Sequence, residues 1–335
     1  MKNIVVPNGS AHRLPFYLAL EEWVAYNLPP EDYFFTWIVA PTVIAGRNQD
    51  IEKEVDITYC RSKGIDICRR RSGGGCVFAD TSNIMVSFIT PDTDVRTTFS
   101  AYTGRVAAQL RAMGIDAEAS GRNDITVGGR KISGNAFYHV PGRSIVHGTM
   151  LYDTDMELMM NAITPSRAKL ESKKVQSVQS HIVTARELMP GMSFQEFHSS
   201  LVAGLADSTY ALSEADIMAV REIEQNYYRP EWLYGRKAAS DNGTYITKTF
   251  TGRIDGVGEL VVTLTTDHDD RIRGVDLKGD FFLLSDLDSG LLKTLEGVKL
   301  TYGALSKALE GTDTGKVIAG MTNSAFINLI TNTID

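Results

Sequence analysis

A run of three glycines at residues 73–75 follows three arginines and a serine, and it constrains this chain more than any other feature. Glycine loses more backbone entropy on folding than any other residue, so a triplet indicates a backbone that needs unusual φ values or a close approach. Arginine presents a planar fork of donors that matches phosphate and carboxylate groups. Residues 69–80 therefore predict a loop whose N–H groups close on an anion, with cationic side chains completing the cage. The alternative is a tight surface turn beside a solvated basic cluster.

Length, charge and cysteine usage narrow the class of protein. The 335 residues suffice for one large domain or two, and the net charge of −7 argues against broad nucleic-acid binding while allowing a local basic pocket. Cys60, Cys68 and Cys76 form no CxxC pair and are typical of reduced thiols, which predicts a cytoplasmic protein. We expect neither a signal peptide nor a transmembrane helix, because no stretch approaches ~18 consecutive apolar residues.

The apolar pattern predicts two domains. Helices are expected over residues 15–27, 97–113, 193–206 and from 213. Strands are expected over 33–39, 42–44, 65–69, 77–78, 84–89 and 144–152. Past the polar stretch at 240–243, an antiparallel meander is expected over 245–250, 260–265 and 272–277, with helices over 283–295 and 306–309. The domains are therefore residues 1–240 and 241–335, the second being a small α+β unit expected to move as a lid.

A second cluster of small and charged residues follows at 120–136. Residues 124–127 and those from Lys131 onward predict two short strands joined by a tight Gly-Gly turn. A hairpin fixes the direction of its side chains, so Lys131 is predicted to be a positioned charge, with an exposed surface lysine as the alternative. His147 lies on the next predicted strand, where it either lines the site or is an ordinary satisfied polar group.

Several common catalytic motifs are missing from the sequence. It contains no Walker A loop, no dinucleotide-binding fingerprint, no zinc-spaced His/Cys cluster and no Gly-x-Ser-x-Gly elbow. The Gly loop, a nearby arginine and the hairpin lysine suit attack of a carboxylate on the α-phosphate of ATP, because cations must offset the repulsion between two anions. Lys131 and Arg70 would bind the charge of the transition state. Asp124 would hold a magnesium ion together with phosphate oxygens.

Three motifs together resemble the lipoate–protein ligase family, in the superfamily that also holds octanoyltransferases and biotin ligases. They are Arg-Arg-x-Ser-Gly-Gly-Gly-x-Val-Phe-x-Asp at 69–80, Ser-Gly-Arg-Asn-Asp-Ile at 120–125 and Gly-Arg-Lys-Ile-Ser-Gly-Asn-Ala at 129–136. Shorter matches lie at 147–149, 177–180 and 232–235. The resemblance implies an α+β fold, in which a large catalytic domain of mixed β-sheet flanked by helices is followed by a small α+β C-terminal domain. Ala79 departs from the pattern, since the family often has histidine there.

The resemblance also implies a two-step reaction. Lipoate and ATP, with Mg²⁺, would give lipoyl-AMP and pyrophosphate, and a lysine of a lipoyl domain would then take the lipoyl group. The acceptors would be the lipoyl domains of 2-oxoacid dehydrogenase E2 subunits and the glycine-cleavage H protein. Lys131 would be catalytic, Asp124 would be the metal ligand and Asn123 would lie in the same pocket. ATP would be bound by Arg70, Gly75, Cys76, Val77, Phe78 and Lys131, and lipoate by Lys131, Arg70, Ser72, Gly74 and His147.

Two other functions stay open at this point. An octanoyl- or lipoyl-transferase of the same fold would use a cysteine nucleophile and an acyl-carrier donor without ATP, but no cysteine follows Cys76. A non-catalytic lipoate- or lipoyl-domain-binding protein would have lost the Gly loop or Lys131, and this chain keeps both. The acyl chain requires an apolar slot, which no motif in the sequence marks.

Overall fold

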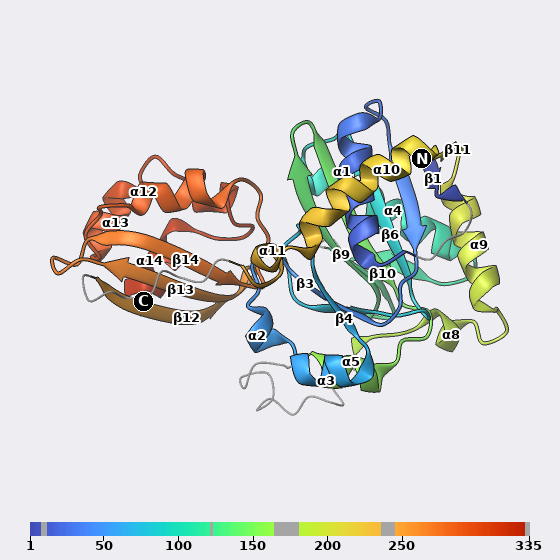
Figure 1. The fold of residues 1–335 in the computed structure, drawn as a ribbon, viewed down its shortest axis with the longest axis horizontal. Coiled ribbons are helices and arrows are strands. Elements are labelled where there is room, and N and C mark those ends of the chain that lie inside the picture. The colour runs from blue at the N-terminus through green and yellow to red at the C-terminus, as the bar shows by residue number, and fades with distance from the viewer. Residues whose placement is uncertain (8–11, 121–122, 164–180, 236–244, 332–335) are drawn as a thin grey trace. The chain divides into compact units, whose positions relative to one another are not determined.

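The computed structural model describes all residues except 8–11, 121–122, 164–180, 236–244 and 332–335 (Figure 1). The chain divides into two compact units. The N-terminal unit comprises residues 1–45, 51–70 and 76–233, and the C-terminal unit comprises 46–50, 71–75 and 234–335. The domain boundary expected near residue 240, and the motif match at 177–180, lie outside the described residues.

The N-terminal unit is built on an eight-stranded mixed sheet. Its strand order is β11-β1-β2-β6-β10-β9-β8-β7, with β1 parallel to both neighbours and the other pairs antiparallel. The strands are β1 Lys2–Val5, β2 Tyr33–Trp37, β6 Ile84–Thr90, β7 Ala117–Ala119, β8 Asp124–Val127, β9 Arg130–Val140, β10 Arg143–Met150 and β11 Ser208–Ala211. Every residue of β6 and β10 is buried, so these two strands form the centre of the unit.

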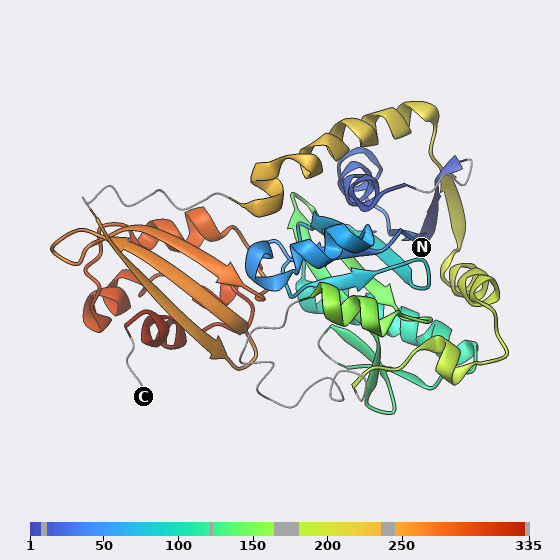
Figure 2. The ribbon, with the colours of Figure 1, turned by 60° about the horizontal axis from the view of Figure 1, so that its bottom comes forward.

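Helices cover both faces of this sheet. Alternate residues of β6 face opposite ways: Ile89 packs in the core around helix α1 (Leu14–Asn27), whereas Phe88 stacks on Tyr102 of α4 (Val95–Ala112), with ring centroids 5.6 Å apart. Helix α10 (Glu214–Glu224) lies beside α1 in both views (Figure 1, Figure 2). The amphipathic α9 (Phe194–Leu205) begins at the capping box of Ser193, as the sequence predicts.

A smaller sheet carries the Gly loop. Strands β3 (Thr42–Ala45), β4 (Asp66–Arg69) and β5 (Val77–Ala79) form it in the order β4-β3-β5, and the glycines lie between β4 and β5. The remaining helices in the described part of the unit are short: α2 Ile51–Glu54, α3 Ile57–Lys63, α5 Met156–Ala162, α8 Ala185–Leu188, the 3₁₀ turn η2 Gln225–Tyr228 and α11 Pro230–Tyr234. Across the described residues, no helix has both the length and the apolar character needed to cross a bilayer.

The C-terminal unit is the expected antiparallel meander with helices on one face. Strands β12 (Ile246–Ile254), β13 (Gly258–Thr266) and β14 (Ile272–Gly279) pair in sequence order. Alternate residues of β13 are buried, which places its apolar side against the helices. These are η3 Asp288–Leu292, α12 Lys293–Leu295, α13 Tyr302–Ala308, η4 Thr314–Lys316 and α14 Asn323–Thr331.

The helix predicted over 283–295 is shorter than expected. It begins only at Asp288, because the preceding chain is extended and pairs with a later segment: Leu283 bridges Ile318, and the Leu284 N–H donates to Val317 O at 2.8 Å. Helix α14 was not predicted at all. Its buried Phe326, Ile327 and Ile330 close the core of this unit.

The Gly loop packs against the backbone of the C-terminal unit. The Gly74 N–H donates to Phe281 O at 3.1 Å, and the Arg47 N–H donates to Ser72 O at 2.9 Å. A Cβ at Gly73 would lie 2.2 Å from the Phe281 carbonyl oxygen, whereas a Cβ at Gly75 would meet no atom within 4 Å. One glycine of the triplet is therefore required by chain packing.

We expect Gly73→Ala to destabilise the C-terminal unit by about 1–3 kcal/mol, because the added methyl group would overlap a backbone carbonyl that cannot rotate away. Urea unfolding followed by circular dichroism measures this. Gly75→Ala is the matched control and should stay within about 0.5 kcal/mol of the parent protein. Equal stability of the two variants would contradict a packing role for Gly73.

Candidate functional site

The hairpin of β8 and β9 brings Lys131 and Asp124 together. Lys131 Nζ lies 2.8 Å from Asp124 Oδ1, and the two side chains are 39% and 30% exposed. No hydrogen bond with favourable angles reaches Asp124 Oδ1 from the described residues, so the contact is an ion pair by distance alone. Both side chains are partly exposed, whereas the oxygen Asp124 Oδ1 is itself buried.

Two side-chain amides fix the backbone at the start of β8. The Asn123 side chain donates to Asn135 O at 2.8 Å, and the Asn135 side chain donates to Asn123 O at 2.8 Å. Asn135 lies over Gly148 of β10, where a Cβ would come within 1.8 Å of the Asn135 amide oxygen. Asn123, expected in the pocket, therefore satisfies backbone groups next to Asp124. Gly121 and Arg122 of the same motif lie outside the described residues.

Arg70 is a buried cation at the end of β4. Its Nη1 donates to Ile44 O at 2.9 Å, and its backbone N–H donates to Ala45 O at 3.0 Å. Burial lowers the pKa of Arg70 to about 10, so the guanidinium is still charged at pH 7. The charge is held in place by the protein before any anion arrives.

His147 belongs to a buried polar cluster centred on Glu21 of α1. His147 Nδ1 lies 2.9 Å from Glu21 Oε1, and Ser87 Oγ donates to the same oxygen at 2.5 Å. Tyr138 OH donates to Glu21 Oε2 at 3.2 Å, and Trp37 Nε1 donates to Ser87 Oγ at 2.9 Å. The carboxylate thus joins the helix to strands β2, β6, β9 and β10. His147 is a buried residue whose Nδ1 is paired with a carboxylate of helix α1.

Sequence reasoning missed Glu21, although a signal was present. Helix α1 is buried on nearly every side, and Glu21 and Glu22 interrupt its apolar residues. Glu22 is satisfied separately, by the hydroxyl of Tyr227 at 2.5 Å. Adjacent carboxylates in the middle of an otherwise apolar helix indicate buried partners, because an unpaired buried charge is very costly.

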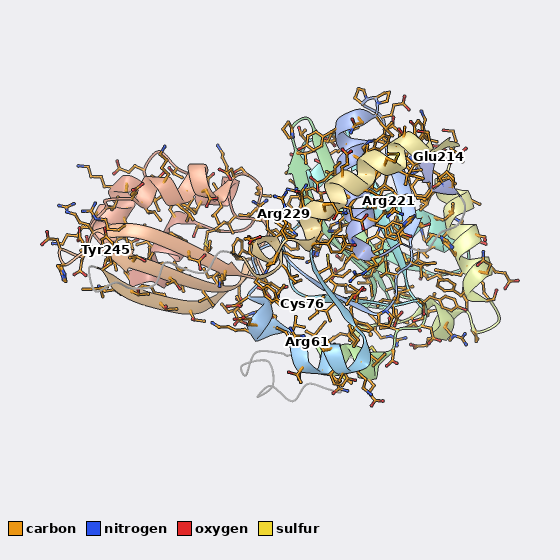
Figure 3. All side chains as sticks on the ribbon, in the orientation of Figure 1. Arg61, Cys76, Glu214, Arg221, Arg229 and Tyr245 are labelled. Atoms are coloured by element: carbon orange, nitrogen blue, oxygen red, sulfur yellow. The ribbon has the colours of Figure 1, made fainter. Side chains whose placement is uncertain are left out.

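The other predicted residues divide between the two units. Val77 and Phe78 lie on β5, and Cys76, labelled in Figure 3, precedes them. The half-buried Cys76 interacts electrostatically with Arg70. Three more predicted residues, Ser72, Gly74 and Gly75, lie in the segment 71–75 of the C-terminal unit. Ala79, at the position where histidine was expected, is fully buried in the core.

Asp124 is the one carboxylate among the predicted site residues that could bind a metal ion. Within the described part of the chain, no three His, Cys, Asp or Glu side chains gather into a metal site. Asp124 alone, with its inward oxygen, fits an ion that takes one carboxylate and completes its shell with phosphate oxygens and water, as magnesium does.

Comparison with known families identifies the protein family in which this hairpin lysine and Gly loop occur. Residues 14–206 match the lipoyl protein ligase A/B catalytic domain, and residues 247–330 match the bacterial lipoate protein ligase C-terminus. The chain belongs to the lipoate–protein ligase family. Lipoate–protein ligase LplJ of Bacillus subtilis is 32% identical over 324 residues, which are 93% of this chain and 95% of that protein. Lipoate–protein ligase 1 of Staphylococcus aureus is 37% identical over 227 residues, 65% of this chain and 69% of that one.

Solved structures show the same fold. LipL1 of P. falciparum, solved in complex with lipoate, matches 99% of this chain and 98% of its own with a TM-score of 0.73 at 18% identity. A lipoate–protein ligase A bound with ATP matches 70% of this chain and 98% of its own with a TM-score of 0.60 at 23% identity. The predicted fold class, a large mixed sheet flanked by helices with a small α+β C-terminal domain, is therefore confirmed.

We expect Glu21→Ala to lower the free energy of unfolding by about 1–3 kcal/mol, because His147, Ser87 and Tyr138 would lose their buried acceptor. Denaturant unfolding measures this. Glu187→Ala is the control, since that exposed carboxylate pairs with Arg130 at the surface, where an ion pair contributes under ~1 kcal/mol. A Glu21→Ala protein as stable as the control would contradict the central place of Glu21.

Proposed function

We propose that this chain activates lipoate with ATP to lipoyl-AMP and transfers the lipoyl group to a lysine of lipoyl domains. The observation that carries the proposal is the position of Lys131, whose ammonium is held 2.8 Å from Asp124 on a rigid hairpin within a ligase motif. Support comes from the family and from the ligands bound in two solved structures of the same fold, lipoate in one and ATP in another.

In the proposed first step, an oxygen of the lipoate carboxylate attacks the α-phosphorus of ATP. The bond to the bridging oxygen breaks, and pyrophosphate leaves with the electron pair. Negative charge builds on the α-phosphate oxygens, and a preorganised cation stabilises that charge more than it stabilises the ground state. Lys131 supplies this cation from the hairpin and Arg70 supplies a second one, already desolvated in the protein.

The same pair suggests how magnesium would be accommodated. When ATP arrives, its phosphates compete with Asp124 for the ammonium of Lys131. Asp124 would then hold the ion by its inward oxygen, together with phosphate oxygens. When bound, magnesium neutralises charge on the phosphates.

In the proposed second step, the amine of the acceptor lysine attacks the acyl carbon of lipoyl-AMP. AMP leaves, and the amine gives up a proton to form the amide. The proposed acceptors are the lipoyl domains of 2-oxoacid dehydrogenase E2 subunits and the glycine-cleavage H protein. A bipartite ligase of the same fold from Thermoplasma acidophilum is described together with its E2 lipoyl domain. The role of residues 241–335 as a lid stays a prediction.

The transferase alternative needs a reactive cysteine. Cys60 and Cys68 are buried, and burial raises the pKa of the Cys68 thiol to about 12, so neither suits nucleophilic attack. Cys76 is half-buried, and the sequence contains no cysteine after it. The observations therefore favour the ligase over the acyl transferase.

We expect Lys131→Met to slow adenylation by about 10²–10³-fold, because one preorganised cation is lost at the developing charge. Pyrophosphate exchange with lipoate measures that step. Transfer from synthetic lipoyl-AMP should fall less, since the anhydride is already made. The fold should be nearly as stable as before, because an exposed ion pair contributes under ~1 kcal/mol.

Arg130→Met is the matched control for Lys131→Met. Arg130 is the neighbouring residue, is equally exposed and is paired with Glu187 at 2.7 Å. Its loss removes a cation from the same hairpin and should leave pyrophosphate exchange within about twofold of the parent rate. Near-normal exchange by Lys131→Met would refute the proposed role of the lysine.

We expect Cys76→Ala to keep most of the ligase activity, since the proposed mechanism uses no thiol. Pyrophosphate exchange and transfer to a lipoyl domain are both measured, with intact-mass spectrometry to search for an acyl-enzyme. An acyl group on Cys76, or loss of transfer in the variant, would favour the transferase instead.

A further inference from the structure

The side chain of Lys131 lies directly across the Cα of Gly134. A Cβ built on Gly134 would lie 2.3 Å from Lys131 Cε and 2.5 Å from Nζ, and 3.7 Å from Asp124 Oδ1. Atoms that are not bonded do not approach so closely, so any side chain at position 134 would displace the ammonium. The end of the Lys131 side chain therefore occupies the space that a side chain at position 134 would take, with Asp124 Oδ1 at van der Waals distance from it.

A β-bulge turns Lys131 toward this space. Asp124 pairs with Gly134 and Thr126 pairs with Lys131, so two steps along β8 correspond to three along β9, and Ile132 is the one extra residue. In a regular strand, residues three apart point to opposite faces. The additional residue brings Lys131 to the face of Asp124 and Gly134, as bulges next to active sites often do.

The backbone on either side of the ion pair is held independently. The carbonyl of Lys131 accepts the Val183 N–H at 2.9 Å, and Asn123 and Asn135 fix the chain next to Asp124. With both main chains fixed, the remaining freedom is that of the lysine side chain. The bare Cα of Gly134 leaves open the position over the strand that this side chain occupies.

We propose that Gly134 is a positioning residue for adenylation, which sets where the ammonium of Lys131 stands. The inference rests on the proposed function of Lys131. Gly134 touches no reacting atom in this proposal, and acts by leaving the space over its Cα to the lysine. The strand position alone does not require a glycine, since its φ lies outside the left-handed region.

The test is a double-mutant cycle between Gly134→Ala and Lys131→Ala. In the parent protein, Gly134→Ala should slow pyrophosphate exchange by about 10- to 100-fold, since a misplacement near 1 Å can cost on the order of 10²-fold. In the Lys131→Ala background the same change should have no effect, because the truncated side chain has no Cε or Nζ to displace. A purely structural role for Gly134 would instead give the same loss in both backgrounds.

Two further measurements complete the test. Gly104→Ala, on α4 with nothing within 4 Å of the new methyl group, should leave exchange unchanged. A crystal structure of Gly134→Ala should show Lys131 Nζ beyond ion-pair distance of Asp124. If Gly134→Ala does not fold, the double variant with Lys131→Ala should recover the native Tm, since the overlap is relieved; failure to recover it would overturn the inference.

The outcomes separate this inference from the proposed function. If Lys131→Ala slows pyrophosphate exchange and Gly134→Ala does not, only the positioning role of Gly134 is overturned. An equal loss from Gly134→Ala in both backgrounds also overturns it, since the damage would not pass through the lysine. Parental exchange by Lys131→Ala refutes the proposed function of Lys131, and with it the inference.

Discussion

The ion pair of Lys131 and Asp124 is the interaction on which the proposed chemistry depends. At 39% and 30% exposure it contributes little to stability, because water screens it and two side chains must be ordered to form it. Its contribution to the proposed reaction is to position the ammonium group. The hairpin and the bulge around Ile132 fix the charge before substrate binds, and a cation already in place needs no reorganisation when charge develops.

Two buried charges, Glu21 and Arg70, stabilise the unit in a different way from this exposed pair. Glu21 lies within the apolar core and is contacted by groups from three strands, β6, β9 and β10, so it ties helix α1 to the centre of the sheet. Arg70 is buried at the end of β4 and bonded to a backbone carbonyl. Removing one partner from such a contact leaves a desolvated charge, which costs far more than the bond itself contributes. The polar groups near the site are therefore also structural.

Three glycines with ordinary φ values are explained by their neighbours. Gly73 is required by the carbonyl of Phe281, and Gly134 by the side chain of Lys131. Gly148 makes room for the amide of Asn135. In each case a hydrogen fits and a methyl group would overlap a neighbour: a backbone carbonyl at Gly73, a hydrogen-bonded amide at Gly148 and a lysine side chain that would have to move at Gly134. The Gly-rich motifs thus serve packing as well as any anion that binds beside them.

The sequence by itself determined many of the elements and the family. Periodicity and capping predicted α1, α4, α9 and the meander, because those signals are local to the chain. The motifs around Arg70 and Lys131 predicted the family, because they combine residue types that one chemistry needs. Local patterns also misled where long-range pairing intervened: the stretch 283–287 looked helical, but Leu283 pairs with Ile318.

Only the tertiary structure decided which residues meet. Glu21 and His147 are 126 positions apart, and the contact between Gly73 and Phe281 joins residues even further apart in the chain. No local signal encodes such contacts, because they depend on how strands are ordered in the sheet. The bulge that turns Lys131 toward Asp124 is likewise a property of strand register, which is set when the whole sheet assembles.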